Sequence, residues 1–341
     1  MVAVVLNKSP KPDSGFKFGL EFREHSVQEP QATESLVKIQ AAALNHRDVW
    51  ILKGMYPGIS PESVMGADAV GIVVQNGPSA SVEVGQRVLL NPGRGWESDE
   101  RGPEGAFRIL GLLPCVGKAV FTKAQVKEGE HVLITGIGGG VALMALQLAV
   151  AAKAHVYVTS SSPEKIQRAI SLGAKGGVNY KDGIVITKDQ GKGVFSDKDQ
   201  IYVLANCIAD LKKLLGNNLL SAVIDGAGGP LYAQYPKVMR PGGIIANYGQ
   251  TGGVQGVTYS MGHVMKHIDL CACTMGSRKE FQDMVAFVER HKIRPVVSQV
   301  WQGLNEKSIE EAIGVMRRGE QFGKLVIEIN GSCSPRLSQK L

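Results

Sequence analysis

The chain has few of the features that mark metal-rich, secreted or membrane-spanning proteins. Its five cysteines form no C-x-x-C pair, so neither a zinc knuckle nor a disulfide framework is indicated, and reduced thiols in a cytosolic protein are expected. The longest nearly apolar run, residues 141–152, is well short of the ~18 residues that cross a bilayer. No basic n-region precedes the short apolar start, which is interpreted as a first strand. We therefore predict a soluble, cytoplasmic protein with no membrane partner.

The charge balance gives little support for a polyanionic partner. The chain has 38 basic and 31 acidic residues, a net charge of +7, but the basic residues are scattered along it. A solvated basic surface explains this pattern better than a nucleic-acid interface, so no nucleic-acid partner is expected. The 42 glycines show no G-X-Y period and indicate glycine-rich turns, while the length of 341 residues indicates about two domains.

The pattern of apolar residues changes near residue 118. Before it, short alternating strands such as residues 35–40 and 69–74 are separated by Gly and Pro, which is typical of an antiparallel barrel. After it, a buried strand at 131–135 leads through a glycine turn into a helix, and a second strand at 156–159 leads into another helix. This alternation predicts an α/β domain with a doubly wound parallel sheet.

The glycine turn has the composition of a phosphate-binding loop. Gly138, Gly139, Gly140 and Val141 lie where a strand ends and a helix begins, so bare backbone and the helix N-terminus could both approach a pyrophosphate. The spacing departs from a strict G-x-G-x-x-G/A pattern, because Ile137 occupies the first glycine position. A tight turn with close helix packing and no ligand is the alternative interpretation.

The end of the second strand indicates which dinucleotide would bind. A carboxylate about twenty residues beyond the glycine turn usually holds the free ribose hydroxyl of NAD. Here that place has Ser160, with Lys165 and Arg168 following, and hydroxyl and cationic groups suit the 2′-phosphate of NADP. We therefore predict NADP in preference to NAD. Ser162-Pro163 can at the same time serve as an ordinary helix start.

Pieces of sequence in a fixed order along most of the chain resemble the medium-chain dehydrogenase/reductase superfamily, in particular its zinc-independent quinone oxidoreductase-like branch. The matching pieces are Asn45-His46-Arg47-Asp48, Gly66-Ala67-Asp68, the glycine turn, Asn179-Tyr180, Asp225-Gly226-Ala227-Gly228-Gly229, Pro241-Gly242-Gly243 and Gly323-Lys324-Leu325-Val326. The resemblance implies a GroES-like antiparallel barrel domain over residues 1–118 and a Rossmann NADP-binding domain over 119–275. A C-terminal segment, 276–330, would return to the catalytic domain, and 331–341 would form a tail.

The resemblance also implies a reaction and a set of site residues. Zinc-dependent relatives have a cysteine at the place of Asn45 and a His-Glu pair at Ala67-Asp68, so no metal site is expected. Hydride transfer from NADPH to a quinone or an α,β-unsaturated carbonyl remains feasible without a Lewis acid. The residues expected to act on the substrate are Asn45, Tyr56 and Tyr248. Those expected to contact the cofactor are Gly138, Gly139, Gly140, Val141, Ser160, Lys165, Tyr180, Asn247 and Lys324. The family further implies a possible homodimer.

Two departures from the family bear on activity. After Pro114 the chain continues directly to residues 115–118, where relatives have a further strand, a turn and a helix, so the catalytic domain is expected to be truncated near Cys115. An atypical insertion, residues 183–206, has poor periodicity and is interpreted as a surface loop. An alternative function is therefore a catalytically impaired nucleotide- or RNA-binding relative that keeps only the Rossmann domain. A cofactor-free structural relative is a third hypothesis.

Overall fold

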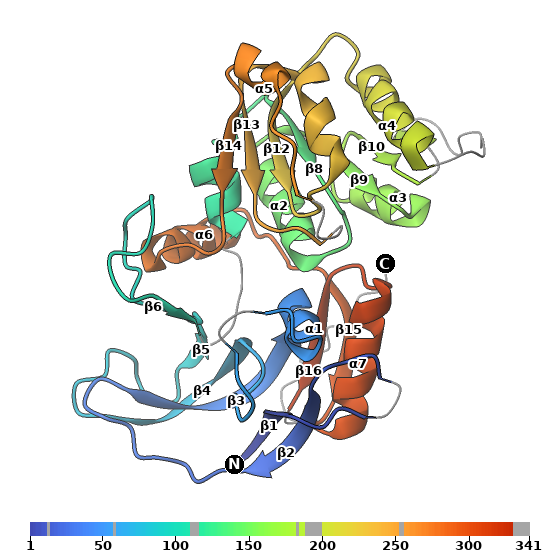
Figure 1. Ribbon diagram of the computed structural model, residues 1–341. Coiled ribbons are helices and arrows are strands. Elements are labelled where there is room, and N and C mark those ends of the chain that lie inside the picture. The colour runs from blue at the N-terminus through green and yellow to red at the C-terminus, as the bar shows by residue number, and fades with distance from the viewer. Residues whose placement is uncertain are drawn as a thin grey trace. The chain divides into compact units, whose positions relative to one another are not determined.

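The computed structural model describes residues 1–11, 14–56, 59–109, 116–181, 184–187, 200–251 and 256–329. By packing, the chain divides into two compact units (Figure 1). Within the described residues, the first unit contains 1–94, 107–109 and 297–329, and the second contains 95–106 and the described residues between 116 and 296. The expected truncation near Cys115 and the expected tail at 331–341 lie outside the described residues, as do residues 188–199 of the insertion.

The first unit is built from mainly antiparallel strands, as expected for a GroES-like domain. A hairpin pairs β1 (Val2–Asn7) with β2 (Gly19–Glu24). A five-stranded sheet has the order β15-β16-β3-β4-β5. Its members are β3 (Ser35–Leu44), β4 (Asp68–Asn76), β5 (Arg87–Leu89), β15 (Val297–Gln302) and β16 (Lys324–Glu328). The short strands β6 (Gly93–Arg94) and β7 (Arg108–Ile109) pair separately.

The last described strand of the chain is part of this N-terminal unit. β16 pairs antiparallel with β3, with Leu325 opposite Leu44. Two helices, α1 (His46–Leu52) and α7 (Glu306–Arg318), pack against each other and enclose an apolar core with Leu325 and Ile327 of β16. Asn305 caps α7 by accepting a hydrogen bond from the Ser308 backbone N–H at 3.0 Å. The pairing fixes Lys324 at the end of β3.

The second unit contains a seven-stranded sheet with the order β11-β10-β9-β8-β12-β13-β14. Its strands are β8 (His131–Ile134), β9 (His155–Ser160), β10 (Gly176–Asn179), β11 (Ile184–Thr187), β12 (Leu220–Asp225), β13 (Met239–Asn247) and β14 (Asp269–Ala272). Six of them are parallel, and only the edge strand β11 is antiparallel to its neighbour. The predicted doubly wound α/β fold is confirmed, because β8 and β12 are neighbours where the strand order reverses.

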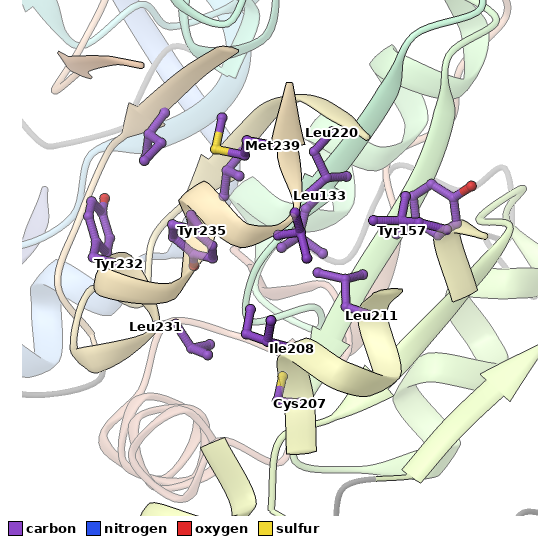
Figure 2. Close-up of a cluster of buried hydrophobic side chains, with 14 of the residues drawn as sticks. Leu133, Tyr157, Cys207, Ile208, Leu211, Leu220, Leu231, Tyr232, Tyr235 and Met239 are labelled. Atoms are coloured by element: carbon purple, nitrogen blue, oxygen red, sulfur yellow. The ribbon is translucent and has the colours of Figure 1, made fainter. Parts of the chain in front are cut away.

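Apolar side chains along the strands alternate between the two faces of the sheet, and helices pack on both faces. α2 (Gly140–Ala151) packs on β8 and β9, and α3 (Pro163–Ser171) packs on β9 and β10. Leu133, Tyr157 and Val223 instead join a core formed with α4 (Gln200–Leu215) and the 3₁₀ helix η2 (Pro230–Lys237). Figure 2 shows Ile208 and Leu211 of α4 facing Leu133 in this core. Among the described residues, no helix is long and apolar enough to cross a membrane.

A buried ion pair joins three segments of the second unit that are distant in sequence. They are the segment 95–106, the π-helical turn η1 (Lys118–Lys123) and α6 (Arg278–Arg290). The Lys118 ammonium donates to the Glu100 carbonyl oxygen at 2.8 Å and to the Glu280 carboxylate at 3.2 Å. Thr122 and Ser277 also donate to Glu280, so the carboxylate is well compensated. A further short helix, α5 (Met261–Met265), precedes the edge strand β14.

The insertion at 183–206 was expected to be a surface loop, and that interpretation is wrong for its two described parts. Residues 184–187 form β11, which extends the sheet next to β10, and α4 begins at Gln200 rather than near Cys207. The physical reason for β11 can be found in the sequence, because Ile184-Val185-Ile186-Thr187 is a run of β-branched residues that favour extended backbone.

Candidate active site

The carboxyl edge of the parallel sheet brings most of the expected cofactor-binding residues together. The register pairs Ser160 with Asn179 across β9 and β10, and Asp225 with Asn247 across β12 and β13. The Tyr180 backbone N–H donates to the Ser160 carbonyl oxygen at 3.0 Å. Loops that follow parallel strands at one edge of an open sheet form the usual ligand crevice of this fold class.

The glycine turn between β8 and α2 leaves open space beside its backbone. It is tied to β9, because the Ile137 backbone N–H donates to the Thr159 carbonyl oxygen at 2.8 Å. Gly138 has a φ of 126°, which disfavours any side chain, whereas Gly139 has an ordinary φ of −73°. Among the described residues, no heavy atom beyond Gly139 and its neighbours in the chain lies within 4 Å of the place where a Cβ on Gly139 would sit. Packing therefore does not require glycine at 139, and the free space at the N-terminus of a twelve-residue helix fits an approaching pyrophosphate.

The segment after β9 presents hydroxyls and a lysine where a ribose clamp is expected. Ser160 is 3% exposed, and its Oγ accepts the Ser162 backbone N–H at 3.1 Å. Ser162 caps α3 by accepting the Lys165 backbone N–H at 3.2 Å, and its hydroxyl donates to Glu164. The helix-start interpretation of Ser162 is therefore confirmed. The role of Ser160 and Lys165 toward a phosphate stays a prediction, as does that of Tyr180.

A buried carboxylate that sequence reasoning did not single out holds the loops at this edge. Asp225 is fully buried and accepts hydrogen bonds from Thr135 Oγ1 at 2.6 Å and from the Gly228 N–H at 2.8 Å. Asn247 Nδ2 donates to the same carboxylate at 3.0 Å. These three hydrogen bonds offset the free-energy cost of removing the Asp225 carboxylate from water. Its signal in the sequence is an acidic residue that follows directly on the buried apolar run Ala222-Val223-Ile224.

Tyr248 follows β13 and lies against the loop after β12. Its backbone N–H donates to the Asp225 carbonyl oxygen at 2.9 Å, and its ring is so close to Gly226 that a Cβ there would come within 2.4 Å of it. Burial, together with the Asp225 charge, raises the pKa of the Tyr248 phenol well above its usual value. Tyr248 is therefore a neutral phenol at physiological pH, able to donate a hydrogen bond.

The first unit brings Asn45 and Lys324 into direct contact. The Lys324 ammonium donates to Asn45 Oδ1 at 2.8 Å, to Asp68 Oδ2 at 2.9 Å and to the Leu44 carbonyl oxygen at 3.1 Å. Its three N–H groups are thus matched by three acceptors, so contact with a cofactor would require one of these bonds to be exchanged. Tyr56 lies nearby in the chain, with the Arg47 guanidinium 5.0 Å from the centroid of its ring.

Asp48 is a second buried carboxyl group in this region. It is 2% exposed, and its Oδ2 accepts the Asn45 backbone N–H at 2.8 Å. Its Oδ1 is enclosed and has no hydrogen-bond partner among the described residues. Burial raises the pKa of Asp48 to about 6, against the lowering effect of the Asn45 N–H and of the Arg47 and Lys324 charges.

Metal-ligating side chains do not gather in the described part of the chain. No group of three or more His, Cys, Asp or Glu side chains there is arranged so that it could hold a metal ion. Asn45 and Asp68 stand at positions where zinc-dependent relatives are expected to have metal ligands. Here both side chains accept a hydrogen bond from the Lys324 ammonium.

Comparison with known proteins identifies the family. The alcohol dehydrogenase GroES-like domain matches residues 31–146, and the zinc-binding dehydrogenase domain matches residues 140–290. Together with the GroES-like first unit and the doubly wound parallel sheet of the second, these matches define an oxidoreductase. The chain belongs to the medium-chain dehydrogenase/reductase superfamily.

The chain is also similar to individual proteins over nearly its whole length. It is 36% identical to the zinc-type alcohol dehydrogenase-like protein YogA of Leptosphaeria maculans, over 379 positions that cover 95% of this chain and 99% of the relative. It is 25% identical to the acryloyl-coenzyme A reductase of Metallosphaera sedula, with 92% and 97% covered. A solved NAD-dependent alcohol dehydrogenase is 26% identical and has a TM-score of 0.76, with 97% and 100% covered.

The open space at Gly139 leads to a prediction that separates folding from binding. Gly139→Ala should change the free energy of unfolding by less than about 1 kcal/mol, because the backbone is compatible with alanine and the methyl group meets no atom. It should weaken NADPH binding by roughly tenfold or more, because the methyl group would occupy the approach of the pyrophosphate. Fluorescence titration and thermal unfolding measure the two effects.

Gly105→Ala is the matched control, since a Cβ there also meets open space but the residue lies in the separate segment 95–106. It should alter neither quantity. Unchanged NADPH affinity in Gly139→Ala would contradict a phosphate-binding role for this turn.

The raised pKa of Asp48 leads to a prediction about pH and stability. Because the folded-state pKa of about 6 exceeds the unfolded value of about 3.9, protonation stabilises the fold below about pH 4, and this contribution is lost as the pH rises through about 6. Asp48→Asn stays neutral and can still accept the Asn45 N–H. The free energy of unfolding of the variant, relative to that of the parent, should therefore rise by about 1–2 kcal/mol when the pH is raised from about 4.5 to about 7.5. Urea unfolding at the two pH values measures the gain, and a difference independent of pH would refute the assignment.

Proposed function

We propose that this protein is an NADPH-dependent, zinc-independent reductase of quinones or α,β-unsaturated carbonyl compounds. The observation that carries the proposal is the contact of Lys324 with Asn45 and Asp68. The two oxygens at the places of zinc ligands are engaged by an ammonium ion of the chain itself. An amide is also a poor replacement for the thiolate that zinc prefers.

Without a Lewis acid, the site must act on a carbon that is already electrophilic. A bound NADPH supplies the hydride, and the carbon–carbon double bond of an enone or the ring of a quinone accepts it. Negative charge then develops on the carbonyl oxygen, which hydrogen-bond donors can stabilise. The side chains that we propose as such donors are Asn45, Tyr56 and the neutral phenol of Tyr248.

Similarity to an acryloyl-coenzyme A reductase supports this substrate class. Acryloyl-coenzyme A is an α,β-unsaturated thioester, and the relative of that name is 25% identical over 92% of this chain. The electrophilic double bond is the feature shared by acryloyl thioesters and enones. The proposal therefore extends to the class of activated double bonds and names no single compound.

A solved relative is NAD-dependent, so similarity to it does not support NADPH. The preference for NADPH is therefore proposed from residues of this chain alone. The residues that we propose to hold the 2′-phosphate are Ser160, buried at the end of β9, and Lys165 on α3. The glycine turn and Asn247 would hold the remainder of the cofactor. Lys324 stays a proposed cofactor ligand, although its present contacts are to protein oxygens.

The length of the alignment bears on catalytic efficiency. The comparison with the Leptosphaeria protein spans 379 positions, more than the 341 residues of this chain, so dozens of positions have no residue here. A shortening near Cys115, as we propose, would account for such positions. A shortened catalytic domain would leave the cofactor half of the site intact and slow the hydride transfer. The unmatched positions therefore favour an impaired nucleotide-binding relative as the second candidate.

A homodimer is the partner that we propose besides the small-molecule substrate. The edge strand β14 pairs only with β13 among the described strands. Apolar side chains beside it are exposed, with Met261 at 67%, Met265 at 74% and Leu270 at 41%. An open sheet edge with an apolar surface favours association with a second copy.

The cofactor proposal predicts an asymmetric response to charge reversal. Lys165→Glu should weaken NADPH binding by roughly tenfold or more and NADH binding by much less, because only the 2′-phosphate loses its cationic partner. Lys175→Glu, at the amino end of β10 and so at the opposite edge of the sheet, is the control with the same charge change. Equal affinity of the parent protein for the two cofactors would contradict the proposal.

The reaction and its independence from zinc can be tested together. The purified protein, treated with a mild chelator and analysed for metals, should contain no stoichiometric zinc and should still oxidise NADPH with at least one member of a quinone and enone panel. The measurements are elemental analysis and the decrease of NADPH absorbance. One zinc per chain, with activity lost on its removal, would show that the proposed mechanism is wrong.

A further inference from the structure

The contacts of Lys324 determine how the Asn45 amide is oriented. A lysine ammonium can only donate hydrogen bonds, so the atom of the amide at 2.8 Å from it must be the oxygen. The amide NH₂ group therefore points away from Lys324. The two other acceptors, Asp68 Oδ2 and the Leu44 carbonyl oxygen, hold the ammonium so that it cannot rotate freely.

The amide NH₂ group is a donor without an acceptor. Asn45 Nδ2 is enclosed and has no hydrogen-bond partner among the described residues, although most buried polar groups in folded proteins are paired. The neighbouring ammonium draws electrons from the amide oxygen and so makes the NH₂ a stronger donor. Such a group is suited to an acceptor that the chain does not supply itself.

The Lys324 side chain is itself well held. It is 22% exposed, and the Asp68 side chain that it contacts is 11% exposed. Its acceptors come from the end of β3, from the residue before α1 and from the start of β4. All belong to the first unit, so the orientation of the amide is set within that unit.

We infer that Lys324 is a positioning residue, which holds the Asn45 amide so that its NH₂ donates to the substrate carbonyl oxygen. This inference rests on the proposed function. As a hydride adds to the β-carbon, the π pair of the carbon–carbon double bond forms a new double bond between the α-carbon and the carbonyl carbon. The π pair of the carbonyl group moves onto its oxygen and gives an enolate. Asn45 stabilises that oxygen by hydrogen bonding and keeps its protons, and water protonates the α-carbon. For a quinone, the same donor faces the phenolate oxygen that forms.

The first variant tests the donor. Asn45→Asp retains an oxygen for the Lys324 ammonium and removes the NH₂ group. It should remain folded and bind NADPH within about threefold of the parent, while kcat falls by about 100-fold or more, since the loss of one such donor has effects of this size.

The second variant tests the positioning residue by chemical rescue. Lys324→Ala leaves a space lined by Asn45 Oδ1, Asp68 Oδ2 and the Leu44 carbonyl oxygen, which ethylammonium ion can enter. We expect kcat, measured at saturating NADPH, to fall at least tenfold, which the loss of a cofactor contact alone would not cause. Added ethylammonium should restore part of kcat and raise the melting temperature of this variant, and it should do neither for the parent. Lys153→Ala, which removes an exposed lysine paired with Glu128, is the control and should respond to no amine.

The outcomes separate this inference from the proposed function. A parent protein that reduces no quinone or enone would overturn the proposed function and the inference with it. An active parent, with Asn45→Asp and Lys324→Ala equally active, would overturn the inference alone. If Lys324→Ala instead weakens NADPH binding and leaves kcat unchanged, Lys324 serves the cofactor and the positioning role is wrong.

Discussion

One ammonium group and its three acceptors organise the first unit. Lys324 is brought to Leu44 because β16 pairs with β3, and it then joins the end of β3, the residue before α1 and the start of β4. A cation at this point neutralises Asp68, which would otherwise be an uncompensated carboxylate at 8% exposure. The chain thus supplies with its own side chain a positive charge at the places where zinc-dependent relatives have metal ligands.

The second unit depends in a similar way on a negative charge. The fully buried Asp225 joins Thr135 at the end of β8 to Asn247 at the end of β13. These residues precede the glycine turn and Tyr248, respectively. The two loops expected to contact a dinucleotide are therefore held to one carboxylate. A buried polar network whose members are all hydrogen-bonded gives these loops a defined position that apolar packing alone would not specify.

Local patterns predicted much of this structure, and contacts between distant segments account for most of what they missed. The strands around Leu133 and Val158, the glycine turn and the cap at Ser162 follow from periodicity and turn chemistry within a few residues. The resemblance to the superfamily supplied the GroES-like domain. The contact of Lys324 with Asn45 spans 279 residues, and no local pattern indicates it. The strand β11 was missed for another reason, since its β-branched run is short and lies in an otherwise polar insertion.

The buried Lys118 has a consequence for dividing this protein into fragments. Its ammonium is bound by Glu100 on one side and by Glu280 on the other, and its ring contact is Trp96, 4.4 Å away. A fragment that began at β8, the first strand of the seven-stranded sheet in the sequence, and ended after β14, the last, would discard all four residues. A fragment that keeps this ion pair must therefore retain residues 95–106, Lys118 and helix α6 in addition to the strands of the sheet.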